Sequence, residues 1–203
     1  MIPQTFIFIG RSGCGKGTQV ELLKKYLGEK MPDTGVFYLE TGARFRAFVG
    51  GDNATAKRAQ VLMKESRRQP DFLAVWMWSH VFVEELTSEV DESKHWIIDG
   101  TPRALPEAVV LDTAMQFYAR EKPFVVHLNV SRDWSEKHLA ARGRADDKAA
   151  GDIKKRLDWY EKDVAPALDW YKIQSGYHFL DVNGEQSIEA VHADFVSKLE
   201  ALA

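Results

Sequence analysis

The stretch from Phe6 to Gly17, FIFIGRSGCGKG, decides the fold of this 203-residue chain. Its first four residues are apolar without interruption, which predicts a short buried strand. A glycine-rich turn follows, and the next segment has apolar residues at helical spacing, at Val20, Leu23 and Leu27. The sequence therefore predicts a buried strand, a glycine-rich loop and a helix in direct succession.

This succession suits the binding of a polyphosphate. Glycines let backbone N–H groups converge on phosphate oxygens, the helix N-terminus adds positive potential, and a lysine supplies a mobile cation. The residues expected to hold the phosphates are Gly10, Gly13, Cys14, Gly15, Lys16, Gly17 and Thr18. A turn that merely connects strand to helix is the alternative, and the correct context on both sides disfavours it. In one detail the loop differs from the commonest pattern, because glycine follows the lysine and the hydroxyl comes one place later.

Composition excludes several classes of protein. Apolar residues make up 45% and charged residues 28% of the chain, which is ordinary for a globular domain. A formal net charge of −3 argues against general nucleic-acid binding, so any basic site must be local. The single cysteine, Cys14, rules out an internal disulfide and a cysteine-clustered zinc site. Because no signal segment or apolar run of membrane-spanning length is present, we expect a cytoplasmic protein with no membrane partner.

Four more apolar runs predict strands. They lie at about 36–39, 95–98, 124–130 and 177–182, and helical segments separate them, including one expected over 54–69 and one that begins at Asp71. Strands that alternate with helices form a parallel sheet with right-handed crossovers. The predicted fold class is therefore α/β, with five parallel strands flanked by helices. In the helix after Asp71 we expect Trp76 and Trp78 to serve core or domain packing rather than to form a base-stacking platform.

Asp99 ends the third predicted strand. Ligands of open α/β sheets bind at the carboxyl ends of the strands, so this carboxylate is expected at a binding site. In a protein with a phosphate loop, an acid at this place holds Mg²⁺, usually through water. The alternative is an aspartate that only caps a helix or a turn.

Several arginines stand in motif contexts around the same edge of the sheet. They are Arg46, Arg103, Arg142, Arg144 and Arg156. Each alone would be read as a solvated surface residue, but five of them beside a phosphate loop are poorly explained that way. Two phosphate-bearing ligands that approach each other need this much positive charge, because phosphoryl transfer depends on positioning and on neutralising oxygens.

Taken together, these motifs resemble the adenylate kinase family of nucleoside monophosphate kinases over essentially the whole chain. The matching motifs are Gly10-x-x-Gly13-x-Gly15-Lys16-Gly17-Thr18, Thr41-Gly42-x-x-x-Arg46, Asp99-Gly100-x-Pro102-Arg103, Arg144-x-Asp146-Asp147 and Ile153-Lys154-Lys155-Arg156-Leu157. The resemblance implies one nucleoside monophosphate kinase domain over 1–203 with a P-loop NTPase core. The core is expected over 1–39, 71–141 and 148–203, a monophosphate-binding insert over about 40–70, and a minimal lid over about 142–147.

The resemblance also implies roles for single residues. The ATP site would combine the phosphate loop with His138, Asn183 and Gly184. The acceptor site would be built from Thr41, Gly42, Arg46, Gly100, Arg103 and Glu107. Lys16, Arg103, Arg142, Arg144 and Arg156 would be catalytic, and Asp99 and Thr18 would lie at Mg²⁺. A lid this short leaves no room for zinc, and because relatives with short lids are commonly monomeric we expect a monomer.

Some positions depart from the family pattern. Ala43, Thr101, His138 and Glu107 replace an aspartate, a phenylalanine, an arginine and a glutamine. A carboxylate can only accept hydrogen bonds, so Glu107 in direct contact with the base would favour guanine over adenine by about 2 kcal/mol. Alternatively, Glu107 turns away to a neighbour such as Arg103, and backbone groups read adenine.

The leading hypothesis is reversible transfer of the γ-phosphoryl group of Mg·ATP to a nucleoside monophosphate, with AMP as the first acceptor. GMP or a pyrimidine monophosphate is the alternative acceptor. Two other classes remain as competitors: a phosphate-loop kinase for another small hydroxylated metabolite, and a nucleotide-binding module without catalysis. Small-molecule nucleotides, and no nucleic acid, are the expected partners.

Overall fold

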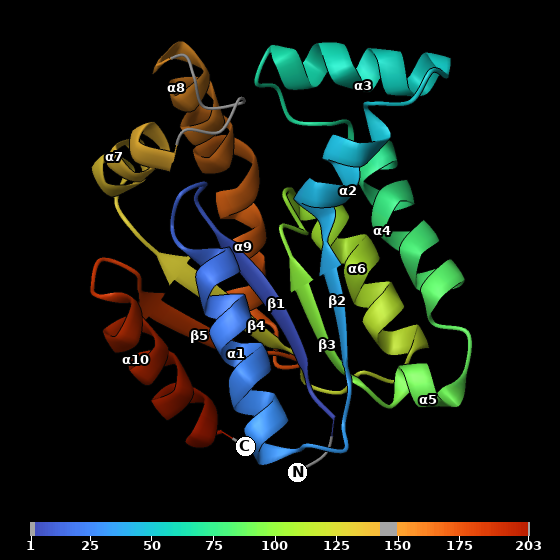
Figure 1. The fold of residues 1–203 in the computed structure, drawn as a ribbon, viewed down its shortest axis with the longest axis vertical. Coiled ribbons are helices and arrows are strands. Elements are labelled where there is room, and N and C mark those ends of the chain that lie inside the picture. Colours follow the sequence, from blue (N-terminus) through green and yellow to red (C-terminus); the bar gives the residue numbers. More distant parts are fainter. Residues whose placement is uncertain (1–2, 143–149, 203) are drawn as a thin grey trace.

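Five parallel strands form one sheet in the order β2-β3-β1-β4-β5 (Figure 1). The strands are β1 (Thr5–Gly10), β2 (Val36–Glu40), β3 (His95–Asp99), β4 (Phe124–Asn129) and β5 (His178–Asn183). The computed structural model describes residues 3–142 and 150–202. All five predicted strands are confirmed, as is the parallel sheet, and β1 lies at its centre between β3 and β4.

Helices cover both faces of the sheet (Figure 1). Those N-terminal to β4 are α1 (Lys16–Lys30), α2 (Thr41–Phe48), α3 (Ala54–Lys64), α4 (Asp71–Glu85), α5 (Glu89–Glu92) and α6 (Leu105–Phe117). Those after β4 are α7 (Arg132–Arg142), α8 (Ala150–Trp159), a π-helical turn (Tyr160–Val164), α9 (Ala165–Ile173) and α10 (Ile188–Glu200). Within the described ranges, no helix is both long and apolar enough to cross a membrane.

The helix predicted over 54–69 is wrong at its C-terminal end. It stops at Lys64, and Ser66 takes a φ of 55°, in the left-handed region that a helix cannot continue through. The next helix begins after Pro70, whose ring fixes φ and favours a helix start. Because of this break, the polar segment between α3 and α4 is not helical.

Alternate residues of β1 face opposite layers, as a strand with period two requires. Phe6 and Phe8 pack with α1 and α10, whereas Ile7 and Ile9 pack with α4, α6 and α9. All four are buried, so the continuous apolar run reflects a strand that is covered on both faces.

The two tryptophans of α4 behave differently. Trp78 is 2% exposed and contacts Phe82 in the core, so the prediction for this residue is confirmed. Trp76 is 42% exposed, with Phe48 on one side and His80 stacked on the other. Trp76 is therefore not a core residue, but it packs between α4 and Phe48 of α2, which is the other kind of packing expected for it.

Gly10 ends β1 where the backbone of β4 approaches closely. An ideal Cβ at Gly10 would lie 2.7 Å from the Leu128 carbonyl oxygen and 2.7 Å from the Cys14 sulfur. We expect Gly10→Ala to lower the free energy of unfolding by about 1–3 kcal/mol, because a methyl group here overpacks the strand end. Urea denaturation measures the change.

The matched control is Gly28→Ala, in the exposed C-terminal part of α1, where a Cβ would meet nothing within 4 Å. Here alanine should raise the free energy of unfolding by about 0.5–1 kcal/mol, since it loses less conformational entropy in a helix. If both variants shifted stability in the same direction, the steric explanation for Gly10 would fail.

Candidate functional site

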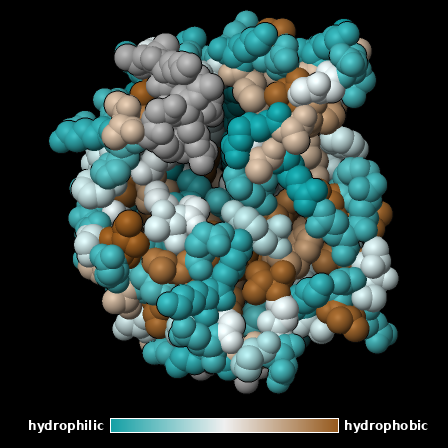
Figure 2. All heavy atoms as spheres, in the orientation of Figure 1, coloured by the Kyte–Doolittle hydropathy of each residue, from teal (hydrophilic) through white to brown (hydrophobic). Residues whose placement is uncertain are grey.

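A cavity of about 720 Å³ opens at the carboxyl edge of the sheet. It lies between the phosphate loop, α2 and α8, and Figure 2 shows hydrophilic residues around the hollow below α3. The structure brings twelve of the predicted site residues to its wall: Gly13, Gly15, Lys16, Gly17, Thr18, Gly42, Arg46, Asp99, Gly100, Arg103, His138 and Arg156. Residues predicted from five separate segments of sequence therefore meet in one place.

The phosphate loop depends on backbone conformations that suit glycine. Gly13 and Gly15 have φ values of 85° and 92°, in the left-handed region. Lys16 opens α1, and its Nζ donates to the carbonyl oxygens of Gly10, at 2.8 Å, and Arg11, at 3.1 Å. The ammonium group thus lies over its own loop, at the wall of the cavity. Cys14 is buried, 4% exposed, and its side chain packs against Gly10 on the protein side of the loop.

The two arginines expected at the acceptor site, Arg46 and Arg103, pack against glycines. Arg46 Nη2 lies 2.7 Å from Glu40 Oε1, and Arg103 Nε donates to the Gly100 carbonyl oxygen at 2.7 Å. A Cβ at Gly42 would lie 3.3 Å from Arg46 Nη1 and 3.5 Å from Arg103 Nη2. The missing side chain at position 42 therefore lets both guanidinium groups converge on the same wall of the cavity.

Positive charge is concentrated here. Burial lowers the pKa of Arg103, and the neighbouring guanidinium groups of Arg156 and Arg46 lower it further, while Glu107 and Asp99 oppose the shift. Like charges are close enough to interact across the cavity, which is unfavourable unless an anion lies between them. The arrangement therefore suits ligands that carry several negative oxygens.

Asp99 is the acid of this site. It is 8% exposed, burial raises its pKa, and Lys16 and Arg103 oppose that shift. Within 3–142 and 150–202, no group of three or more His, Cys, Asp or Glu side chains could hold a metal ion. A carboxylate with the Thr18 hydroxyl on the same wall nevertheless fits Mg²⁺, which prefers hard oxygen ligands and keeps several waters and substrate phosphates.

Thr41 and Glu107 lie behind the wall of the cavity rather than in it. The Thr41 and Thr101 hydroxyl oxygens are 2.7 Å apart, and both residues are buried. Glu107 is 1% exposed, and its Oε2 accepts a hydrogen bond from the Arg103 backbone N–H at 2.6 Å. Burial raises the pKa of this carboxyl. Of the two arrangements considered for Glu107, the structure contains the one in which it bonds Arg103, through the main chain.

The residues expected at the ATP base lie at two places. His138 lines the main cavity, stacks on Trp134 with ring centroids 4.3 Å apart, and has Nδ1 2.8 Å from the Trp134 carbonyl oxygen. Asn183 lines a neighbouring hollow of about 310 Å³. Gly184 packs between the end of β4 and the phosphate loop, where a Cβ would lie 2.6 Å from Val130 Cγ1. His138, Asn183 and Gly184 thus flank the loop on the side of α7 and β5.

Two of the predicted catalytic residues lie beyond what the structure describes. Arg144 and the lid segment 143–147 fall outside the described residues, and so does the side chain of Arg142. Their roles remain predictions, as does the absence of zinc.

Some residues of the cavity wall were not predicted. They are Ser12, Glu21, Tyr38, Glu40, Phe45, Met63, Ser66, Arg67, Arg68, Gln69 and Trp159. Position in the sequence could have indicated two of them. Glu40 ends a predicted strand directly before Thr41, and Trp159 follows Arg156 by three residues, which places both on one face of a helix.

Known proteins resemble the chain along most of its length. A family model described as adenylate kinase matches residues 8–176. Adenylate kinase 1 of Nostoc sp. is 31% identical over 185 residues, which cover 91% of this chain and 92% of the relative. Adenylate kinase 1 of Synechocystis sp. is also 31% identical over 185 residues, 91% of each chain. Adenylate kinase of Flavobacterium psychrophilum is 31% identical over 192 residues, which cover 91% and 92%.

Proposed function

Because the chain belongs to the adenylate kinase family and is a nucleoside monophosphate kinase, we propose that it transfers the γ-phosphoryl group of ATP reversibly to AMP, giving two ADP. The single observation that carries the proposal is the meeting of Lys16, Arg46, Arg103 and Arg156 around one cavity that also holds Asp99. One nucleotide would need only part of this charge. Two phosphate-bearing ligands facing each other account for all of it.

The phosphate loop and the arginines would contact different phosphate groups. The amides of the phosphate loop and Lys16 Nζ would bind the donor phosphates at the N-terminus of α1. Arg46 and Arg103, held against Gly42, would bind the acceptor phosphate. Arg156 would lie against the oxygens of the group in transfer, where negative charge spreads in the transition state. The residues position the reactants and neutralise charge, and none forms a covalent bond.

The family uses ATP with Mg²⁺, and we propose that Asp99, through water, and Thr18 hold the ion here. When bound, Mg²⁺ neutralises charge on the donor phosphates. The buried carboxylate favours a cation, because its ionised form costs free energy without one.

A coupled assay of ADP formation from ATP tests the proposal, with AMP, GMP, CMP, UMP and dTMP as separate acceptors. We expect the largest kcat/KM for AMP. Rapid turnover with another monophosphate and none with AMP would keep the reaction class and overturn the acceptor. Failure with every monophosphate would overturn the function.

Glu107→Gln tests what the buried carboxylate does. The glutamine amide oxygen can accept the same hydrogen bond from the Arg103 N–H, so we expect the ranking of acceptors to stay the same and kcat/KM for AMP to change less than about threefold. Glu107→Leu leaves that N–H without its partner and should lower kcat/KM for AMP by about 10-fold or more. A ranking that changed between wild type and Glu107→Gln would mean that Glu107 contacts the base after all.

A further inference from the structure

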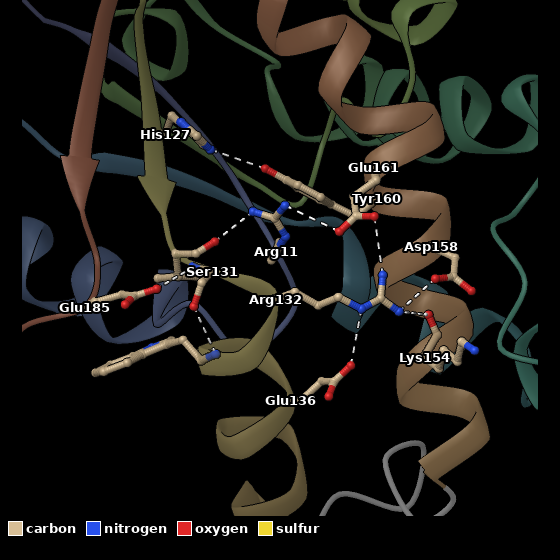
Figure 3. A network of polar contacts seen from close by, with 12 residues as sticks. Arg11, His127, Ser131, Arg132, Glu136, Lys154, Asp158, Tyr160, Glu161 and Glu185 are labelled. Carbon is tan, nitrogen blue, oxygen red and sulfur yellow. Dashed lines mark hydrogen bonds and ion pairs between the residues drawn. The ribbon is translucent and has the colours of Figure 1, made fainter.

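Arg11 belongs to the phosphate loop, but its guanidinium group points away from the cavity. Nη1 donates to the Val130 carbonyl oxygen at 2.7 Å, and the group lies over the Tyr160 ring, 4.7 Å from its centroid. Nη2 is 3.5 Å from Glu161 Oε1. In Figure 3, Arg11 lies between the end of β4 and the helix that carries Tyr160 and Glu161. This arginine therefore ties the loop to the end of β4 and to the helix that carries Tyr160 and Glu161.

Glu161 divides its two carboxylate oxygens between two arginines from distant parts of the chain. Oε1 faces Arg11, and Oε2 lies 3.3 Å from Arg132 Nη1, as Figure 3 shows. Arg11 comes from the phosphate loop and Arg132 from the start of α7. One carboxylate thus joins the phosphate loop, α7 and the π-helical turn.

Arg132 extends this network along α8. Its Nη2 lies 2.7 Å from Asp158 Oδ1 and 3.3 Å from the Lys154 carbonyl oxygen, and its Nε is 3.3 Å from Glu136. The contacts with Lys154, Asp158 and Glu161 span two turns of one continuous helix. The contact with Glu136 stays within α7 and connects nothing else.

The π-helical turn contacts both the sheet and the phosphate loop. The Tyr160 hydroxyl is 3.2 Å from His127 Nε2 on β4, while the Tyr160 ring and the Glu161 carboxylate both contact Arg11. π-helical turns are rare and widen a helix locally, often at functional sites. Arg156 lies on the same helix, five residues before Glu161, and lines the cavity.

We propose that Glu161 is a positioning residue for phosphoryl transfer, because it fixes the helix that carries Arg156 relative to the loop that carries Lys16. The inference rests on the proposed function. The two cations must lie on either side of the group in transfer, and phosphoryl transfer depends on such placement together with the neutralisation of charge. Glu161 touches neither reactant and acts through Arg11 and Arg132.

The variant that tests this is Glu161→Gln, which keeps the size of the side chain and removes its charge. We expect kcat to fall about 10-fold while KM for ATP changes less than about twofold, because misplacement acts on the transition state. Thermal stability should hardly change, since such half-exposed ion pairs contribute little to folding.

Glu136→Gln is the matched control. Glu136 is as exposed as Glu161, 47% against 45%, and its carboxylate is also 3.3 Å from Arg132, but the pair lies within α7. We expect wild-type kcat within about twofold. A fall in kcat equal to that of Glu161→Gln would show that loss of an Arg132 partner, and no link between elements, causes the effect, and would overturn the inference.

A double-mutant cycle with Arg11→Met tests the ion pair between Glu161 and Arg11. If Glu161 acts through Arg11, the double variant should lose little more kcat than the more damaged single variant, whereas additive losses would contradict the link. Backbone hydrogen exchange in α8 is a readout that does not need activity. It should speed up in Glu161→Gln and stay unchanged in Glu136→Gln.

These readouts separate the inference from the function on which it rests. A wild-type enzyme without turnover on any monophosphate overturns the proposed function, and the hydrogen exchange of α8 still decides whether Glu161 holds the helix. An active wild type whose Glu161→Gln variant keeps full kcat and unchanged exchange overturns the positioning role alone.

Discussion

Lys16→Met is expected to abolish nearly all phosphoryl transfer and to leave the fold intact. The ammonium group lies at the wall of the cavity and contacts the carbonyl oxygens of its own loop, so the core does not depend on its charge. Loss of one such charge from the site of phosphoryl transfer is expected to remove about 3 to 5 kcal/mol of transition-state stabilisation. Steady-state kinetics with saturating nucleotides measures the loss, and circular dichroism checks the fold.

Lys25→Met is the control for Lys16→Met. Lys25 lies on the same helix, with a side chain 77% exposed, and makes only a 4.0 Å contact with Glu29 among the described ion pairs. Its replacement should leave kcat unchanged. If Lys16→Met kept more than a tenth of wild-type turnover, the assignment of this loop to the transferred phosphate would be wrong.

Arg156→Ala should lower kcat by about 100-fold or more and change KM for ATP by much less. Its guanidinium group lines the cavity near Arg103, where we propose that it contacts the oxygens in transfer. Single-turnover kinetics separates the chemical step from ATP binding. A variant with raised KM and full kcat would instead make Arg156 a residue of ground-state binding.

The neighbouring Lys154→Ala serves as its control. Lys154 has an exposed side chain, and its contact with Arg132 is through its carbonyl oxygen, which alanine retains. Both variants remove one positive charge from α8. Equal effects on kcat would mean that the net charge of the helix matters rather than the place of one guanidinium group.

Local patterns in the sequence predict the elements and the phosphate loop well. A run of four apolar residues, three glycines and a lysine constrain the backbone within a dozen positions, so β1, the loop and α1 follow from short-range physics. The meeting of Arg46 and Arg103 follows from the rule that parallel strands share one carboxyl edge, because these residues follow β2 and β3. The order of the strands and the place of Arg156 on α8 come from the three-dimensional structure.

The direction of single side chains could not be predicted in the same way. Spacing places Glu107 four residues after Arg103, in the first turn of α6, but the choice between the base and the Arg103 N–H depends on packing in three dimensions. The pairing of Arg11 with Glu161 joins residues 150 positions apart, and no local pattern marks either of them. The π-helical turn also has no signature in the apolar spacing of its residues.

The π-helical turn also decides how the helix responds when its length changes by one residue. A π-helical turn holds one residue more than an α-helical turn does, so the chain could lose a residue such as Lys162 and still close a continuous helix through Tyr160–Val164. Elsewhere in an α-helix each residue advances the phase by about 100°, so a deletion there turns one part of the helix relative to the other. Because the π-helical turn already accommodates one extra residue, a deletion within it would restore α-helix and leave α8 and α9 on their present faces, with Arg156 still at the cavity. The turn is therefore a place where the length of this helix can change by one residue without moving the residues of the site.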